Sequence, residues 1–144
     1  MRKQKVVIIN GPNLNLLGQR EPEVYGQDTL DDLEEFLTVK YADKINLEFY
    51  QSNIEGELVN KIHEAFKLQY DGIIINAGAY THYSLAIHDA LKSINVPSIE
   101  VHISNIHNRE EFRKNSVIAP ATVGQISGFK LKSYALAVEY FLML

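Results

Sequence analysis

The sequence contains no cysteine, and this absence excludes several kinds of chemistry. Without thiols the chain cannot form disulfides, iron–sulfur clusters, cysteine-ligated zinc sites or a thiolate nucleophile. It also lacks any hydrophobic run near the roughly 20 residues that cross a bilayer. The run at 6–9 falls short of the hydrophobic core of a signal peptide, which needs about 7 residues or more. These absences predict a cytoplasmic protein with no membrane partner.

The sequence has no excess of positive charge either. Its 14 lysine and arginine residues stand against 18 acidic residues, which gives a net charge of -4. Nucleic-acid binding usually requires a basic face, so this balance disfavours nucleic acid as a partner. With 144 residues, 46% of them hydrophobic, the chain is expected to form one domain spanning 1–144.

Short hydrophobic runs alternate with helical patterns along the whole chain. Strands are predicted at 6–9, 45–50, 73–75, 99–103 and within 117–126, and helical patterns at 29–41, 58–69, 87–94 and 131–142. Thr29 and Asp32 resemble a capping box that opens the first helix. This alternation predicts an α/β protein, a flavodoxin-like three-layer sandwich with a five-stranded parallel sheet in the order 2-1-3-4-5. Ligands bind in such folds beyond the carboxyl ends of the strands, near strands 1 and 3.

Polar side chains follow the predicted strands at that edge. Asn10 and Asn13 follow the first strand, Asn76 and His82 the third, and Ser104 the fourth. Such a convergence at one end of a hydrophobic sheet is typical of a small-molecule pocket. A phosphate loop is not indicated, because neither G-x-G-x-x-G nor a G-K-[ST] ending occurs. The asparagine-rich loop only half resembles a flavin site.

The segment 10–28 is long for a connection between a strand and a helix, where about two to six residues is usual. Gly18 and Gly26 bracket Arg20 and Tyr25, so the intervening segment could pivot as a lid over the pocket. A mobile surface loop with a solvated arginine is the alternative, and the sequence does not choose between them.

Among the five histidines, His102 has the most informative surroundings. Glu100 and His102 are two residues apart on a strand and therefore point to the same side. A carboxylate beside an imidazole orients the ring and favours its charged form, as a general acid requires. A salt bridge at a strand end explains the pair equally well. His63, His88 and His107 are interpreted as surface residues. No two histidines are four residues apart, the spacing with which a helix presents two histidines to a metal ion.

Several motifs together resemble the type II 3-dehydroquinate dehydratases. They are Ile9-Asn10-Gly11-Pro12-Asn13-Leu14-Asn15-Leu16-Leu17-Gly18, Arg20-Glu21-Pro22, Tyr25-Gly26, Asn76-Ala77-Gly78-Ala79-Tyr80-Thr81-His82, Glu100-Val101-His102-Ile103-Ser104-Asn105, Arg109-Glu110-Glu111-Phe112-Arg113, Ser116 and the stretch 124–128. The resemblance spans nearly the whole chain in the same order and spacing. It implies dehydration of 3-dehydroquinate to 3-dehydroshikimate in the shikimate route to aromatic amino acids. It also implies a flavodoxin-like fold, no metal, no cofactor and no Schiff base, and a dodecamer built from trimers.

The resemblance also implies catalytic roles for individual residues. Tyr25 would be the base that removes the C2 proton, and Arg20 would favour its tyrosinate form, since a phenol ordinarily ionises near pH ~10. Asn13 would hold a water that stabilises the enolate. His102 would protonate the departing C1 hydroxyl while Glu100 holds its ring.

Binding roles for the substrate follow from the same resemblance. The residues implied are Asn76, His82, Ile103, Ser104 and Arg113, with Asp89 completing the site of a neighbouring subunit. Ala77, His88 and the stretch 128–132 depart from the common pattern of the family without removing a chemical group. Two other interpretations are a non-catalytic flavodoxin-like module that binds a flavin or another small molecule, and an inactive relative.

Overall fold

A computed structural model describes residues 2–144 and contains a five-stranded parallel sheet in the order β2-β1-β3-β4-β5. The strands are β1 (Gln4–Asn10), β2 (Ile45–Gln51), β3 (Gly72–Asn76), β4 (Ser98–His102) and β5 (Gly124–Ser127). The helices are α1 (Pro22–Tyr25), α2 (Leu30–Tyr41), α3 (Glu55–Lys67), α4 (Leu85–Lys92) and α5 (Lys132–Leu142).

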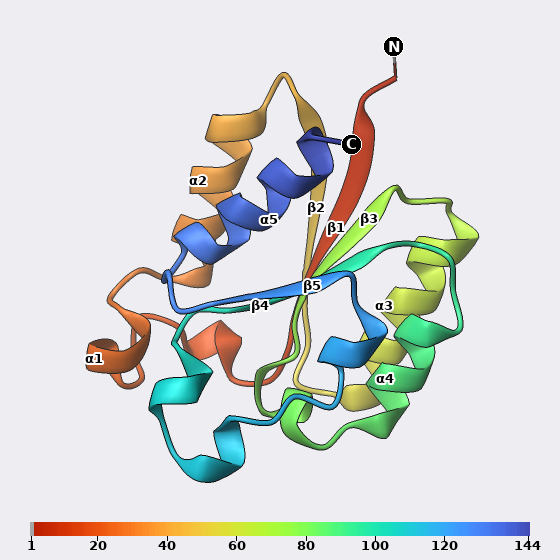
Figure 1. Ribbon diagram of the computed structural model, residues 1–144. Coiled ribbons are helices and arrows are strands. Elements are labelled where there is room, and N and C mark those ends of the chain that lie inside the picture. Colours follow the sequence, from red (N-terminus) through yellow and green to blue (C-terminus); the bar gives the residue numbers. More distant parts are fainter. Residues whose placement is uncertain (1) are drawn as a thin grey trace.

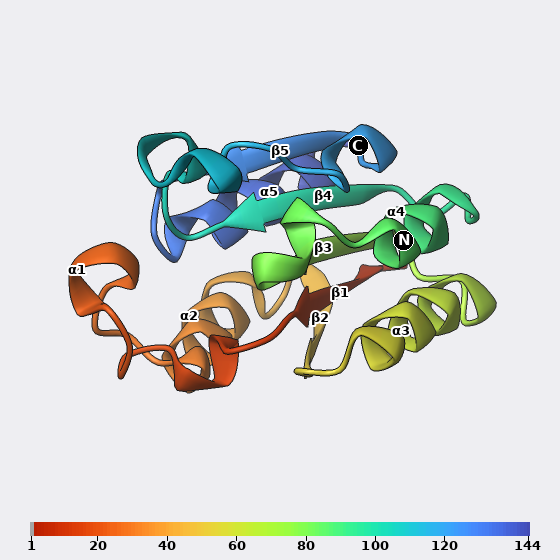
Figure 2. The same cartoon turned by 90° about the horizontal axis from the view of Figure 1, so that it is seen from below.

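Helices cover both faces of the sheet, as Figures 1 and 2 show. Helices α2 and α5 lie on one face, and α3 and α4 lie on the other. The three layers and the strand order confirm the predicted flavodoxin-like α/β fold.

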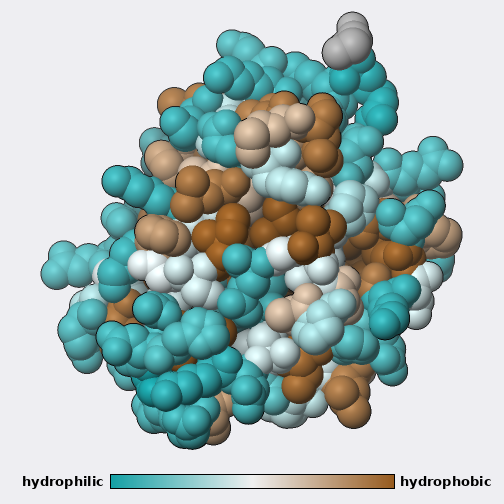
Figure 3. Space-filling model, viewed as in Figure 1, coloured by the Kyte–Doolittle hydropathy of each residue, from teal (hydrophilic) through white to brown (hydrophobic). Residues whose placement is uncertain are grey.

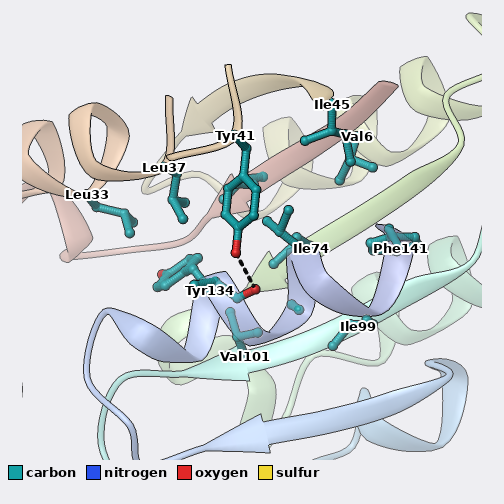
Figure 4. Packing of buried hydrophobic residues seen from close by; sticks show 14 of the residues in the cluster. Val6, Leu33, Leu37, Tyr41, Ile45, Ile74, Ile99, Val101, Tyr134 and Phe141 are labelled. Atoms are coloured by element: carbon teal, nitrogen blue, oxygen red, sulfur yellow. Dashed lines mark hydrogen bonds between the residues drawn. The ribbon is translucent and has the colours of Figure 1, made fainter. Parts of the chain in front are cut away.

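The hydrophobic core is divided between the two faces because residues alternate along each buried strand. Val6, Ile8 and Ile74 face α2 and α5, whereas Val7 and Ile73 face α3 and α4. Figure 4 shows the first of these clusters, with Leu33, Leu37 and Tyr41 of α2 packed toward Tyr134 and Phe141 of α5. Burial on both faces explains the uninterrupted hydrophobic runs of β1 and β3.

Most element boundaries agree with the sequence, and the exceptions have local causes. The capping box of Thr29 and Asp32 is present, with both hydrogen bonds formed. Helix α4 ends at Lys92, so Ile94 lies beyond it. Strand β5 begins only at Gly124, because the segment before it contains Pro120 within a 3-10 turn, Ala119–Ala121.

The backbone segments that follow β1 and β3 pack closely against each other at the carboxyl edge of the sheet. The Gly11 N–H donates to the carbonyl of Asn76 at 2.7 Å. A Cβ on Gly11 would lie 2.5 Å from the carbonyl oxygen of Ala77. Only glycine therefore fits here, and the loops that follow β1 and β3 are held side by side.

One face of the molecule has a conspicuous hydrophobic region. In Figure 3 hydrophobic residues gather in the middle of the face, around the edge strand β5 and the adjoining part of α5. The exposed side chains in this part of the chain include Val123, Phe129 and Leu136. Between residues 2 and 144, no helix is long and hydrophobic enough to cross a membrane.

Candidate active site

A cavity opens at the carboxyl ends of β1, β3 and β4, where the fold predicted a ligand site. It is lined by Pro12, Asn13, Leu14, Arg20, Tyr25, Asn76, Gly78, Ala79, His82, His102, Ile103, Ser104, Ile106, Arg109 and Arg113. Most of the residues singled out in the sequence therefore lie together. Two do not line the cavity: Glu100 lies behind His102, and Asp89 is exposed on α4.

The segment 10–28, for which the sequence left a lid and a mobile surface loop open, contains more ordered structure than a loop of its length suggests. A 3-10 turn, Leu14–Leu16, is followed by the short helix α1, which ends at Tyr25. Gly18 and Gly26 flank this part of the chain with φ values of 91° and 88°, conformations that other residues rarely adopt. The position of α1 places Tyr25 in the cavity wall.

Two guanidinium groups flank the Tyr25 phenol. Arg20 donates from Nη2 to the hydroxyl at 3.2 Å, and Arg109 donates from Nη1 at 2.8 Å. Both groups also lie against the ring, 4.5 and 5.2 Å from its centroid. Tyr25 therefore has positive charge on two sides of its hydroxyl oxygen.

Arg109 lines the cavity and contacts Tyr25, which the sequence did not reveal. The motif that contains it, Arg109-Glu110-Glu111-Phe112-Arg113, predicts a binding role for Arg113 alone. Besides Tyr25, Arg109 donates to Ser104 Oγ at 3.3 Å, so it links the end of α1 to the segment after β4. Since 84 positions separate Arg109 from Tyr25, no local spacing could have signalled this contact.

The Glu100 carboxylate is fully buried and holds the ring of His102. It accepts a hydrogen bond from His102 Nε2, another from Thr81 at 2.5 Å, and a third from the single hydroxyl of Ser116, whose oxygen lies 2.8 and 2.9 Å from the two carboxylate oxygens. Burial favours the protonated carboxyl, but the hydrogen bonds and the charge of His102 outweigh it, so the pKa of Glu100 is lowered from its ordinary 4.5. Glu100 is therefore ionised, and because Nε2 of His102 is engaged with it, Nδ1 is the ring atom left for a ligand.

Other cavity residues are held by well-defined contacts. Asn13 adopts a φ of 69°, and its N–H donates to Asn53 Oδ1 at 2.9 Å. The His82 Nδ1 lies 2.8 Å from the carbonyl of Asn115. A carbonyl can only accept, so Nδ1 carries the hydrogen and Nε2 is the ring atom left for a ligand.

All three surface interpretations of histidines can be compared with the structure. His63 and His107 are exposed, as expected. His88 is half-buried, and its Nδ1 lies 2.7 Å from the carbonyl of Val117, so the expectation that it is a solvated surface residue was wrong. Within residues 2–144, no cluster of three or more histidine or acidic side chains is arranged to hold a metal ion.

Taken together, the fold and the cavity define a flavodoxin-like α/β enzyme with acid–base groups at the carboxyl edge of its sheet. Comparisons with known proteins specify the family. The family model "Dehydroquinase class II" matches residues 4–142. The chain therefore belongs to the class II dehydroquinase family, whose members are lyases.

Individual relatives agree with this assignment. A 3-dehydroquinate dehydratase from Caldicellulosiruptor saccharolyticus is 61% identical over 137 residues, covering 94% of each chain. One from Fusobacterium nucleatum is 56% identical, covering 94% of this chain and 95% of its own. Among solved structures, the type II dehydroquinase from Butyrivibrio crossotus has a TM-score of 0.95 at 49% identity, covering 96% of this chain and 97% of its own.

Lys130 makes a contact that predicts how firmly the lid is held. Its ammonium donates to the carbonyl of Val24, near the end of α1, at 2.5 Å. Replacing Lys130 with methionine removes this bond but keeps a β-carbon at a residue whose φ is 54°. We expect tryptic cleavage after Arg20 to become about fivefold faster, because the open lid gains roughly 1 kcal/mol in relative stability.

The matched control is Lys132→Met, which also removes one exposed lysine and one tryptic site from the same segment. Cleavage after Arg20 in that variant should match the unmodified protein. Equal cleavage rates in both variants would show that the Lys130 bond does not hold the lid.

Proposed function

We propose that this protein dehydrates 3-dehydroquinate to 3-dehydroshikimate, a step of the shikimate route, by anti elimination through an enolate. One observation carries the proposal: Tyr25, flanked by two guanidiniums, lines the same cavity as His102, whose ring is held by the ionised Glu100. The cavity thus brings together a phenol flanked by two cations and an imidazole held by a carboxylate, which we assign as the base and the acid of the elimination. The named relatives support the same substrate.

In the first step the Tyr25 phenolate removes a proton from C2 of the substrate, next to the C3 ketone. The electron pair of the broken C–H bond moves into the carbonyl, which becomes an enolate oxygen. A water held by Asn13 donates a hydrogen bond to that oxygen as its charge develops. Arg20 contacts the phenol oxygen directly and places positive charge beside the phenolate in this step.

In the second step the enolate collapses and forms the C1–C2 double bond. The C1 hydroxyl leaves with a proton from His102, so one molecule of water is released. Tyr25 has then gained the proton that His102 has lost, and proton exchange with solvent restores both groups. Because side chains supply both proton transfers, the proposed reaction uses no metal, cofactor or imine.

The substrate is an anionic polyol and requires several hydrogen-bond partners. We assign this role to Asn76, His82, Ile103, Ser104 and Arg113, all of which line the cavity. Asp89 lies outside the cavity of its own chain, which fits a role in the site of a neighbouring subunit. The exposed hydrophobic region around β5 is consistent with a homo-oligomer. We propose a dodecamer of twelve chains, built from trimers, in which each chain is a single catalytic domain. We also propose that the protein is cytoplasmic.

The direct test is ultraviolet absorbance on mixing the purified protein with 3-dehydroquinate. Dehydration creates a conjugated enone, so absorbance should rise with time and in proportion to enzyme concentration. The rate should be unchanged by a chelator, and light scattering should report the mass of twelve chains. No rise from a folded oligomer would instead favour the binding module, which predicts a co-purifying flavin or other small molecule.

A further inference from the structure

The hydroxyl of Tyr134 lies in the core beneath the cavity, between Asn10 and Asn76. The proposed mechanism gives Asn10 no role and does not say what orients the Asn76 side chain. Tyr134 belongs to α5 and is fully buried in the cluster that Figure 4 shows. Its oxygen lies 2.6 Å from Asn10 Oδ1 and 2.9 Å from Asn76 Nδ2. Asn10 and Asn76 are paired neighbours at the carboxyl ends of β1 and β3.

The direction of each hydrogen bond in this group follows from what the atoms can donate. The backbone N–H of Gly78 points at Asn76 Oδ1 at 3.1 Å, so that side-chain atom must be the amide oxygen. Asn76 Nδ2 is therefore the end that faces Tyr134, and it donates to the phenol oxygen. The single Tyr134 proton is left to donate to Asn10 Oδ1.

This arrangement leaves one N–H of Asn76 free to donate to a ligand. The amide oxygen is engaged by Gly78, and one Nδ2 hydrogen is engaged by Tyr134. The second Nδ2 hydrogen remains, on a side chain that lines the cavity. Asn76 is thus a fixed donor and cannot rotate to present its oxygen without losing both bonds.

The Tyr134 phenol is protonated near neutral pH. Burial raises the pKa of Tyr134 far above its ordinary value, and the hydrogen bond from Asn76 offsets only part of that effect. The direction of the bonds is therefore independent of pH near neutrality.

From this geometry we propose that Tyr134, together with Asn10, is a positioning residue that holds the Asn76 amide with its N–H toward the substrate. It would make this corner of the cavity selective for an acceptor, such as a carboxylate oxygen. The inference rests on the proposed function in one respect, namely that Asn76 contacts the substrate.

The test is a double-mutant cycle that joins Tyr134→Phe and Asn76→Ala. Tyr134→Phe keeps the ring in the core but removes the hydroxyl, so Asn76 retains only the bond from Gly78. We expect KM to rise about tenfold, as for one weakened bond to a charged group, with kcat changed by less than about threefold. In the Asn76→Ala background the same substitution should change KM by less than about twofold.

Tyr41→Phe is the matched control, because Tyr41 is also a buried tyrosine of the same cluster. Its hydroxyl bonds to the Ala135 carbonyl and to Glu139, with no contact to the cavity. Both tyrosine variants should lower the urea midpoint of unfolding, but only Tyr134→Phe should raise KM.

The outcomes separate the positioning role from the proposed function. An unchanged KM in Tyr134→Phe, or an equal rise in the Asn76→Ala background, would overturn the positioning role while leaving the reaction intact. If Asn76→Ala itself leaves KM unchanged, Asn76 does not bind substrate and the proposal is also overturned. Absence of turnover in the unmodified protein would refute the proposed function first.

Discussion

Tyr25→Phe is expected to reduce kcat by about 10³-fold or more while KM stays within about tenfold of its original value. The substitution removes only the hydroxyl oxygen, which is the atom that both Arg20 and Arg109 contact. Phenylalanine cannot accept a proton, so the elimination loses its base. The ring remains available to pack against the two guanidiniums, so ground-state binding should change little. Steady-state kinetics by enone absorbance measures both parameters.

The suitable control is Tyr83→Phe, which removes a hydroxyl from a tyrosine that is 62% exposed and does not line the cavity. Its kinetics should be those of the unmodified protein. Retention of more than about a tenth of kcat in Tyr25→Phe would exclude the phenolate as the base. A large rise in KM with kcat preserved would instead assign Tyr25 to binding.

The sheet could be predicted from the sequence because burial leaves a direct signature. A strand covered on both faces is hydrophobic at every position, as Ile73, Ile74 and Ile75 are, and its polar successor Asn76 marks the edge. Glu100 and His102 could be paired for a similar reason, since the two-residue period of a strand fixes their relation. Both inferences depend only on short-range geometry along one element.

Contacts between distant segments left no such signature. The Arg109–Tyr25, Lys130–Val24 and Tyr134–Asn76 hydrogen bonds each join residues more than fifty positions apart. Arginine and lysine at those positions are compatible with ordinary solvated surface, and a tyrosine in a helix stripe is compatible with ordinary core. Resemblance supplied the roles of cavity residues, but it gave no account of the side chains that hold them in place.

Glu100→Gln is the second substitution for which we expect a large effect, about 10²- to 10³-fold on kcat. Glutamine has nearly the same shape as glutamate but carries no negative charge beside the His102 ring. Its amide nitrogen can donate to His102 Nε2, which favours the neutral ring over the imidazolium that protonates the leaving hydroxyl. Thr81→Val offers a milder comparison, because it removes one donor to Glu100 and keeps the charge.

The same substitution should change how stability depends on pH. The pKa of Glu100 is lowered in the folded protein, so the folded state binds its proton less readily than the unfolded state does. Its contribution to the free energy of unfolding is therefore complete above about pH 4.5, and it is lost as pH falls through the lower folded value. Glu100→Gln should cost about 1–3 kcal/mol at pH 7, and this deficit should shrink steadily below about pH 4.5.

Urea unfolding of the unmodified protein and of Glu100→Gln, between about pH 3 and pH 7, measures how the stability difference between them depends on pH. Asp71 and Glu110 also have lowered pKa values, but they are present in both proteins and cancel when the two curves are subtracted. A deficit that stays constant down to pH ~3 would mean that the hydrogen bonds of Thr81, Ser116 and His102 do not overcome the burial of the carboxylate. If the stability deficit of Glu100→Gln shrinks at low pH and its kcat is also reduced, the buried Glu100 carboxylate both stabilises the fold and supports His102 as the proposed acid.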